Sequence, residues 1–297
     1  MKVLNFGSLN IDYVYQLDHF VRPGETLHSQ SLSVFCGGKG LNQSIALARA
    51  GANVHHAGCV GIEDGQMLLD ALSDSGVNTA NISMVETRSG NAVIQVNKRG
   101  ENCIILFGGA NDCVSPHHVD GVIDKFQRGD YLLLQNEINC IGLIIEKASE
   151  KGMTVVFNPS PYNDMIHSLP LHLVDVFLVN EIEGMEIAGT HNPKPERILS
   201  ALREKFPIAK IVLTLGKRGV IYFDGGDVNS HDIYDVPVVD TTAAGDTFTG
   251  YFLAGLIKGK SSPRIIEIAS KASSITVSRF GASVSIPTMD EVMSFQI

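Results

Sequence analysis

The residues best suited to chemistry lie in one short segment, Asp240-Thr241-Thr242-Ala243-Ala244-Gly245-Asp246-Thr247-Phe248. Its small residues at 243–245 allow the backbone to approach a ligand closely, and an apolar helix is predicted to begin there. The unpaired N–H groups and the positive dipole end of that helix would form an anion hole. Asp246 lies in the first turn, where a carboxylate can accept a proton from a hydroxyl while the amides bind developing negative charge.

An aspartate in the first turn of a helix often serves as a simple cap, so this segment has an ordinary explanation as well. Two features favour the chemical interpretation: small residues precede Asp246, and a second acid, Asp240, lies close before it. The common phosphate-binding loops are missing from the sequence. No P-loop pattern occurs, and Gly38-Lys39-Gly40-Leu41-Asn42-Gln43 departs from G-x-G-x-x-G at its last position.

Two further polar clusters could bind a hydroxylated substrate. The glycines of Cys36-Gly37-Gly38-Lys39-Gly40 permit positive φ angles before a predicted helix, and Asn42 offers both a donor and an acceptor to hydroxyls. Asn10 and Asp12 follow the first predicted strand, where an amide and a carboxylate suit a polyol in an α/β crevice. Alternatively, Lys39 is an ordinary solvated charge, and Asn10 and Asp12 are turn formers.

The rest of the chain predicts an α/β fold that would position these clusters. Short apolar segments are typical of strands buried on both faces, and they lie at residues 2–6, 53–57, 131–134, 153–157, 174–179, 210–214 and 220–223. Helical patterns lie between them, at residues 40–50, 64–75, 116–125, 141–151, 181–189, 194–205, 245–258 and 263–279. This alternation predicts a mostly parallel central sheet with helices on both faces.

Two segments break the alternation. Residues 13–35 are strand-like around the turn signal Arg22-Pro23-Gly24-Glu25, and residues 89–107 read as a hairpin that turns at Lys98-Arg99-Gly100. Because neither supplies a helix, we expect both to form a small separate β-sheet that acts as a lid over the strand ends. An extra hairpin at the edge of the main sheet is the alternative. Residues 1–297 are otherwise predicted to form a single domain.

The composition excludes several classes of protein. Acidic side chains number 32 and basic ones 23, giving a formal net charge of −9, which argues against nucleic-acid and anionic-membrane binders. No apolar run approaches the roughly 18 residues that a membrane span needs, and no signal peptide is expected. The five cysteines show no C-x-x-C spacing, so neither a disulfide framework nor a structural zinc site is expected. We therefore expect a cytoplasmic protein.

Four motifs together resemble the ribokinase family of carbohydrate kinases, in the family's order and over nearly the full length of the chain. They are Gly37-Gly38-Lys39-Gly40-x-Asn42-Gln43, Asn180-Glu181-Ile182-Glu183, Thr214-Leu215-Gly216-Lys217-Arg218-Gly219 and the segment 240–248. Each would be a weak signal alone. Within the family, the members that phosphorylate ribose are suggested by Pro23-Gly24-Glu25-Thr26, by the Ala-Ala-Gly-Asp form of the last motif, and by Gly108-Gly109-Ala110-Asn111.

The resemblance implies an ATP-dependent sugar kinase with a ribokinase-like fold. Such an enzyme would transfer the γ-phosphoryl group to a sugar hydroxyl, with ribose as the expected acceptor and ribose 5-phosphate as the product. Asp246 would be the catalytic base, and the amides of Ala243, Ala244 and Gly245 would stabilise the transferring group. The sugar site would comprise Asn10, Asp12, Gly38, Lys39, Gly40, Asn42, Glu137 and Asp246.

The same resemblance implies nucleotide and cation sites. ATP would contact Asn180, Thr214, Leu215, Gly216, Lys217, Arg218, Gly219, Gly245 and Ser270. Mg²⁺ would be organised by Asn180 and Glu183 through water, since Mg²⁺ gives up its waters reluctantly. A monovalent cation, expected to be K⁺, would lie near Asp240, Thr242, Thr276, Arg279, Gly281 and Ser285, with backbone carbonyls supplying much of its shell.

Two alternative functions stay open at this point, and the sequence also predicts a dimer. A related kinase could act on another sugar, a nucleoside or a sugar phosphate, because Leu41 is larger than the alanine usual in the family beside Asn42. A non-catalytic sugar-binding regulator would be expected to lose the base or the small residues, and this chain keeps both. The alternating apolar residues of the lid (Val93 or Ile94, and Ile104 or Ile105) predict a homodimer through that sheet.

Overall fold

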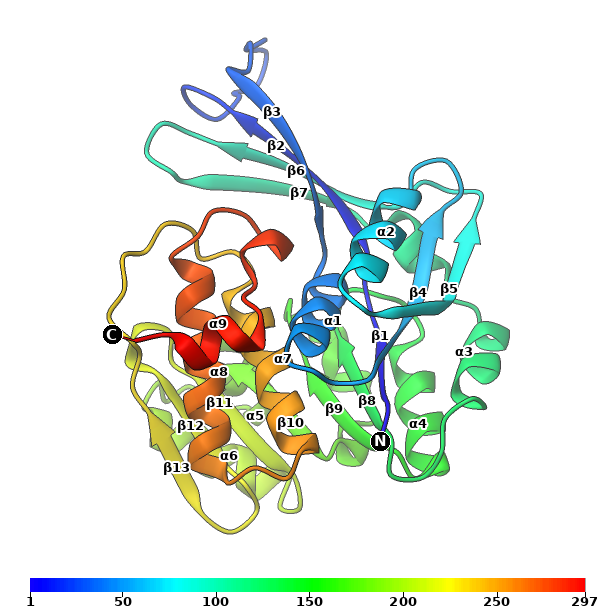
Figure 1. Cartoon of the computed structure of the whole chain (residues 1–297), viewed down its shortest axis with the longest axis vertical. Coiled ribbons are helices and arrows are strands. Elements are labelled where there is room, and N and C mark those ends of the chain that lie inside the picture. The colour runs from blue at the N-terminus through cyan, green and yellow to red at the C-terminus, as the bar shows by residue number, and fades with distance from the viewer. Residues whose placement is uncertain (297) are drawn as a thin grey trace.

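The computed structural model describes residues 1–296 and shows a large α/β body from which a smaller sheet projects (Figure 1). Across the main sheet the strands lie in the order β13 (Val228–His231), β12 (Val220–Phe223), β11 (Lys210–Thr214), β10 (Val176–Asn180), β9 (Thr154–Asn158), β8 (Tyr131–Gln135), β1 (Val3–Phe6), β4 (Val54–Gly61) and β5 (Asn78–Val85). Neighbouring strands are parallel except at β11–β12 and β12–β13. The predicted mostly parallel sheet is confirmed.

Helices cover both faces of this sheet, because successive side chains of a strand point to opposite sides. Leu4 and Phe6 of β1 join the core that packs α3 (Pro116–Ile123), α4 (Ile141–Lys151), α5 (Glu181–Ala188) and α6 (Pro195–Lys205). Val3 joins the core that packs α1 (Lys39–Arg49), α2 (Gln66–Asp74), α7 (Ala244–Ile257), α8 (Ser262–Val277) and α9 (Met289–Ser294). Within residues 1–296, none of the helices combines the length and apolar character needed to span a membrane.

The smaller sheet stands off the body, as predicted for a separate lid sheet (Figure 1). Its strands lie in the order β3 (Ser31–Gly37), β2 (Asn10–Gln16), β6 (Gly90–Val96) and β7 (Asn102–Phe107). β2 pairs antiparallel with β3 and parallel with β6, and β6 pairs antiparallel with β7. The sheet is thus formed by two hairpins distant in the sequence, and neither extends the edge of the main sheet.

Two predicted site residues lie in a strand and not, as their residue types also suggested, in a turn. Asn10 and Asp12 lie within β2, where Asn10 pairs with Gly90 and Gly37, and Asp12 pairs with Ala92 and Phe35. A Cβ at Gly90 would lie 2.3 Å from Asn10 Oδ1, and one at Gly37 would lie 2.0 Å from Asp12 Oδ2. The two side chains therefore occupy space left by glycines of neighbouring strands, a relation that no local pattern reveals.

Three elements were not predicted from the sequence: β5, β13 and α9. β5 and β13 are the edge strands of the main sheet; β5 has a single buried residue and β13 has none, so neither shows the continuous apolar pattern of a central strand. α9 is a six-residue helix stabilised by a capping box between Thr288 and Glu291. These elements take their stability from neighbours and capping more than from hydrophobic periodicity.

Gly250 sets the distance between α1 and α7. A Cβ at this position would lie 2.4 Å from Ala46 Cβ and 2.8 Å from the Leu47 amide nitrogen. We expect Gly250→Ala to lower the free energy of unfolding by about 1–3 kcal/mol, because the two helices must separate. Urea denaturation measures this loss. Gly121→Ala in α3 is the control, since nothing lies within 4 Å of its Cβ; that change should stabilise by about 0.5–1 kcal/mol, and an equal loss in both variants would contradict the explanation.

Candidate active site

The N-terminus of α7 has the local geometry of an anion hole. Its N-cap, Ala243, adopts a left-handed conformation with φ 60°, which is uncommon for a residue with a side chain. The amides of the first turn lack helical partners, and the Ala244 amide makes only a long 3.3 Å contact with the Thr241 carbonyl oxygen. Ala244 and Gly245 line a cavity, so the first turn of α7 faces an open space.

The Asp246 carboxylate is held from the first turn of α1. Asn42 Nδ2 donates to Asp246 Oδ2 at 3.0 Å, and Gln43 Nε2 donates to Asp246 Oδ1 at 2.9 Å. Burial raises the pKa of Asp246, against the opposing effects of the Lys39 charge and of these two hydrogen bonds. A raised pKa makes the ionised group a better proton acceptor. Gln43 was not among the predicted site residues, although its position beside Asn42 in the glycine motif was a signal.

Lys39 and Glu137 form the charged wall of a second, polar site. Glu137 Oε2 accepts from the Lys39 amide at 3.0 Å and from Ser8 Oγ at 2.5 Å, while Lys39 Nζ lies 3.4 Å from Glu137 Oε1. Burial would lower the pKa of Lys39, but the charges of Glu137 and Asp246 outweigh it and the pKa is raised. Lys39 therefore stays positively charged between two acids. Sequence reasoning missed Ser8, which also accepts from the Gly40 amide at 3.1 Å.

Asp12 and Asn10 extend this polar site into the lid. The pKa of Asp12 is raised to about 7, first by burial and then by the Glu137 charge, with Lys39 opposing. Asn10 Oδ1 accepts a 2.7 Å hydrogen bond from Asn111 Nδ2, which fixes the orientation of the Asn10 amide. The structure thus brings side chains from β2 and α1 and the segment after β8 to one place, which suits a polyhydroxylated ligand.

The glycines of the motif at residues 37–43 are required by close backbone approach. Gly38 has φ +92°, and a Cβ at Gly40 would lie 2.3 Å from the Ser8 amide nitrogen. This close approach positions Asn42, whose buried Oδ1 has no hydrogen-bond partner among residues 1–296. A buried acceptor without a partner is costly, so it indicates a donor supplied by a ligand or by water.

A cavity of about 500 Å³ lies on the other side of the α7 N-terminus. Of the residues predicted to contact a nucleotide, it is lined by Thr214, Gly216, Lys217, Gly219, Gly245 and Ser270. The remaining wall includes the apolar side chains Ile233, Val236, Val238, Phe248 and Val277. Mixed apolar and polar walls of this size are typical of small-molecule sites. Residues 233–238 were missed, because this segment has no regular secondary structure to predict it.

Three predicted nucleotide contacts lie apart from this cavity lining. The Leu215 side chain is buried, and Arg218 forms an ion pair with Glu181. Asn180 caps α5. Its side-chain Oδ1 accepts from the backbone amide of Glu183 at 2.9 Å, and its backbone amide donates to Glu183 Oε2 at 3.0 Å. Burial raises the pKa of Glu183, against the Asn180 hydrogen bond. Asn180 and Glu183 are therefore together, as the Mg²⁺ prediction requires, and they offer hard oxygen donors.

The residues predicted for a monovalent cation are only partly brought together. Asp240 Oδ1 accepts from the amide and hydroxyl of Thr242, at 2.9 and 2.7 Å, and Asp240 Oδ2 accepts from the Gly281 amide at 3.1 Å. The other predicted side chains bond elsewhere: Thr276 to Thr247, Arg279 to Glu291, and Ser285 to the Ala282 carbonyl. The Arg279 guanidinium has no acceptor atom, so Arg279 could contribute only through its backbone oxygen.

Comparisons with known proteins identify the family of the chain. The family model described as pfkB family carbohydrate kinase matches residues 1–289. A protein named ribokinase from Haemophilus influenzae is 36% identical over 97% of this chain and 96% of its own length.

Two solved structures are similar over nearly the whole chain. The ribokinase of Cryptococcus neoformans in complex with ADP has a TM-score of 0.85 and 33% identity, covering 98% of each chain. The ribokinase of Arabidopsis thaliana complexed with ribose and ATP has a TM-score of 0.86 and 27% identity, covering 99% of each chain. With the family model spanning residues 1–289, this chain belongs to the pfkB family of carbohydrate kinases.

Proposed function

We propose that the protein is an ATP-dependent ribose kinase, which forms ribose 5-phosphate and ADP. The observation that carries the proposal is the position of Asp246 between two sites. Its carboxylate is held by Asn42 and Gln43 beside the polar site, while its neighbours Ala244 and Gly245 line the 500 Å³ cavity. One of the two similar structures is a complex with ADP and the other a complex with ribose and ATP, which supports ATP and ribose as substrates. The cytoplasm, which supplies ATP, is the proposed location.

In the proposed reaction, Lys39, Asn42, Glu137 and Asp12 orient the sugar hydroxyls by charge-assisted hydrogen bonds. Asp246 accepts the proton of the attacking hydroxyl as its oxygen bonds to the γ-phosphorus and the bond to ADP breaks. The first-turn amides of α7 bind the negative charge that spreads over the transferring oxygens. Placing both substrates at one helix end contributes orientation as well as charge stabilisation.

Cations would complete the site. Asn180 and Glu183 would hold Mg²⁺ through water, and the ion would neutralise charge on the phosphates when bound. Each side chain uses one oxygen in the α5 capping box and keeps lone pairs free for water. Asp240 and nearby backbone oxygens, including those of Thr242, Thr276, Arg279, Gly281 and Ser285, would bind K⁺.

An acceptor panel tests the proposed function. ADP release would be measured with the full chain, Mg²⁺ and K⁺, using ribose, other pentoses and hexoses, adenosine, and sugar phosphates. We expect the highest kcat/KM with ribose, and a higher value for another acceptor would overturn ribose as the substrate. Sugar phosphates should be poor acceptors, because three cations of the lid region are already paired: Arg88 with Glu63 and Asp64, Lys98 with Asp18, and Arg99 with Glu101. Absence of ADP release with every acceptor would favour a non-catalytic binding protein.

We also propose a homodimer through the lid sheet. All residues of β7 are exposed, and Ile104, Ile105, Leu106 and Phe107 are 49–61% exposed. An apolar strand of this length exposed at a sheet edge needs cover. We expect the wild type to sediment as a dimer at micromolar concentration and Ile105→Asp to raise the dimer dissociation constant at least tenfold. Asn102→Asp on the same strand adds a charge without removing apolar surface and should stay dimeric; a monomeric wild type would contradict the proposal.

A further inference from the structure

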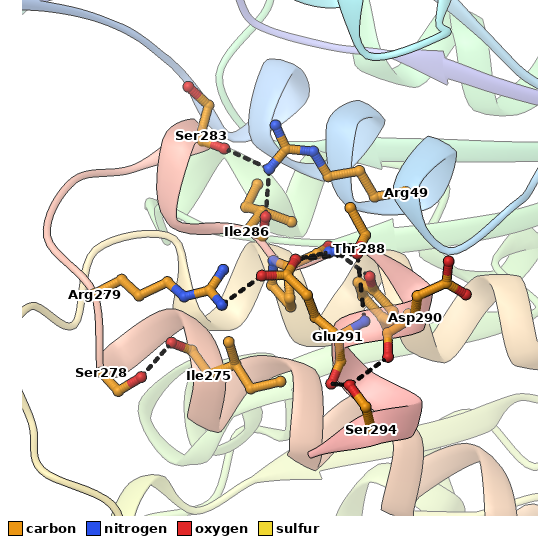
Figure 2. A network of polar contacts seen from close by, with 12 residues as sticks. Arg49, Ile275, Ser278, Arg279, Ser283, Ile286, Thr288, Asp290, Glu291 and Ser294 are labelled. Carbon is orange, nitrogen blue, oxygen red and sulfur yellow. Dashed lines mark hydrogen bonds and ion pairs between the residues drawn. The ribbon is translucent and has the colours of Figure 1, made fainter.

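The loop 280–286 is hydrogen-bonded to the segment 36–49, which contains the glycine motif at residues 37–43 and helix α1. Arg49, at the end of α1, donates through Nη1 to the Ser283 carbonyl at 3.1 Å and to the Ile286 carbonyl (Figure 2). Ser283 Oγ donates to the Cys36 carbonyl at 3.0 Å, next to the glycines of the motif. The loop therefore takes its position from both ends of the segment 36–49.

The same loop contacts the turn that precedes the anion hole. The Gly281 amide donates to Asp240 Oδ2 at 3.1 Å, and the other oxygen of that carboxylate fixes the amide and hydroxyl of Thr242. Thr242 directly precedes Ala243, the left-handed N-cap of α7. A shift of Gly281 would therefore release Asp240 and loosen the turn that sets the direction of the first-turn amides.

We infer that Arg49 is a positioning residue for the anion hole, a conclusion that rests on the proposed kinase function. Through the loop 280–286 and Asp240, Arg49 holds the α7 N-terminus in the orientation that binds the transferring phosphoryl group. The sugar-binding side chains Lys39 and Asn42 lie at the opposite end of α1 from Arg49, and the loop is joined to that end by Ser283 and Cys36, in a hydrogen bond that Arg49 does not make. Loss of Arg49 should thus affect the transition state and leave the binding of the sugar intact.

The anchoring of the loop shows why Arg49 matters at this place. On its far side, the loop is fixed by α9. There the Glu291 carboxylate accepts from the amide of the N-cap residue Thr288 at 2.7 Å and pairs with Arg279 at 2.6 Å (Figure 2). Between these anchors, the carbonyls of Ser283 and Ile286 both depend on a single nitrogen of Arg49. A lysine at position 49 could bring one ammonium group to both carbonyls, so it should restore part of the effect.

Lys258 provides a matched control. Its Nζ donates to the Ala50 carbonyl at 2.8 Å, so it also binds a backbone oxygen at the end of α1, but it joins that end to α7 and not to the loop. We expect Arg49→Met to lower kcat about 10–100-fold with the ribose Kd within twofold, because small misplacements of catalytic groups are costly. Arg49→Lys should recover part of kcat, and Lys258→Met should keep kcat within about twofold even at an equal loss of Tm.

Hydrogen exchange of the free protein gives a readout that needs no substrate. The amides of residues 242–247 should exchange faster in Arg49→Met than in the wild type, and Lys258→Met should leave them unchanged. Ser283→Ala, which removes only the bond to Cys36, should give a smaller increase. Equal exchange in Arg49→Met and Lys258→Met, or a parallel loss of ribose affinity and kcat, would overturn the inference. A wild type inactive with ribose would instead refute the proposed function, and the exchange result would still decide the role of Arg49.

Discussion

Replacing Asp246 with asparagine should reduce kcat by roughly 10²–10⁴ and change the ribose Kd less than threefold. The amide has nearly the same shape as the carboxylate but cannot accept the proton of the attacking hydroxyl. Two donors, Asn42 Nδ2 and Gln43 Nε2, meet the carboxylate at 3.0 and 2.9 Å. The asparagine oxygen can satisfy one of them, so the site should stay assembled. Steady-state ADP release measures kcat, and calorimetry measures the ribose Kd.

Asp290→Asn is the matched control for the interpretation of Asp246 as a simple helix cap. Asp290 also lies in the first turn of a helix, α9, but it is exposed and far from the cavity lining. Loss of a favourable interaction with a helix dipole costs only about 0.3–1 kcal/mol of stability. If both variants lost only stability and kept the wild-type kcat, Asp246 would have no role as a base.

Replacing Asp12 with asparagine should weaken ribose binding about 10–100-fold at pH 8, because a hydrogen bond to a charged group contributes about 1.5–3 kcal/mol. The carboxylate lies beside Lys39 and Glu137 in the polar site, and its pKa is about 7. At pH 8 the wild-type group is largely ionised and accepts hydrogen bonds from hydroxyls. Titration calorimetry of the two proteins with ribose at pH 6 and pH 8 should show the difference shrinking at the lower pH.

Asp12→Asn should increase the free energy of unfolding, although it weakens ribose binding. The pKa of Asp12 is raised from 3.8 to about 7 on folding, so the folded protein prefers the neutral carboxyl. The cost of ionising Asp12 in the folded protein is therefore absent below about pH 4, grows as the pH rises, and reaches its full value above pH 7. At about 1.4 kcal/mol per pKa unit, the upper limit is about 4 kcal/mol. Asp12→Asn avoids this cost, so its advantage in unfolding free energy should grow from pH 4 to pH 7 and then remain constant.

Asp130→Asn is the control for that pH dependence. Asp130 is more deeply buried than Asp12, and its carboxylate accepts from the amides of Lys2 and Gln127 at the opposite end of β1 and β8 from the site. Removing those acceptor oxygens should destabilise the protein at neutral pH and leave ribose binding unchanged. An Asp12→Asn variant that behaved in the same way would show that Asp12 is only a structural residue.

The main sheet could be predicted because its strands and helices are encoded locally. Most predicted strands are short apolar segments bounded by Gly, Asn, Asp or Pro, and the predicted helices carry apolar residues at helical spacing. β5 and β13 were not predicted, because edge strands pair with only one neighbour and tolerate polar residues. The placement of Asn10 and Asp12 in β2 was not predicted, because that strand forms only when β3 and β6 pair with it.

By itself, the sequence determined the α/β class, the helix start at 243–246 and the motifs that identify the family, since all of these depend on residues close together in the chain. The tertiary structure decided how the motifs work together. Asn42 and Gln43 reach Asp246 across 204 and 203 residues of chain, and Arg49 reaches Ser283 across 234. The pKa of Asp12 likewise depends on desolvation at its place in β2 and on the charges of Glu137 and Lys39. Such effects arise from through-space distances and solvent exclusion, which exist only once the chain has folded.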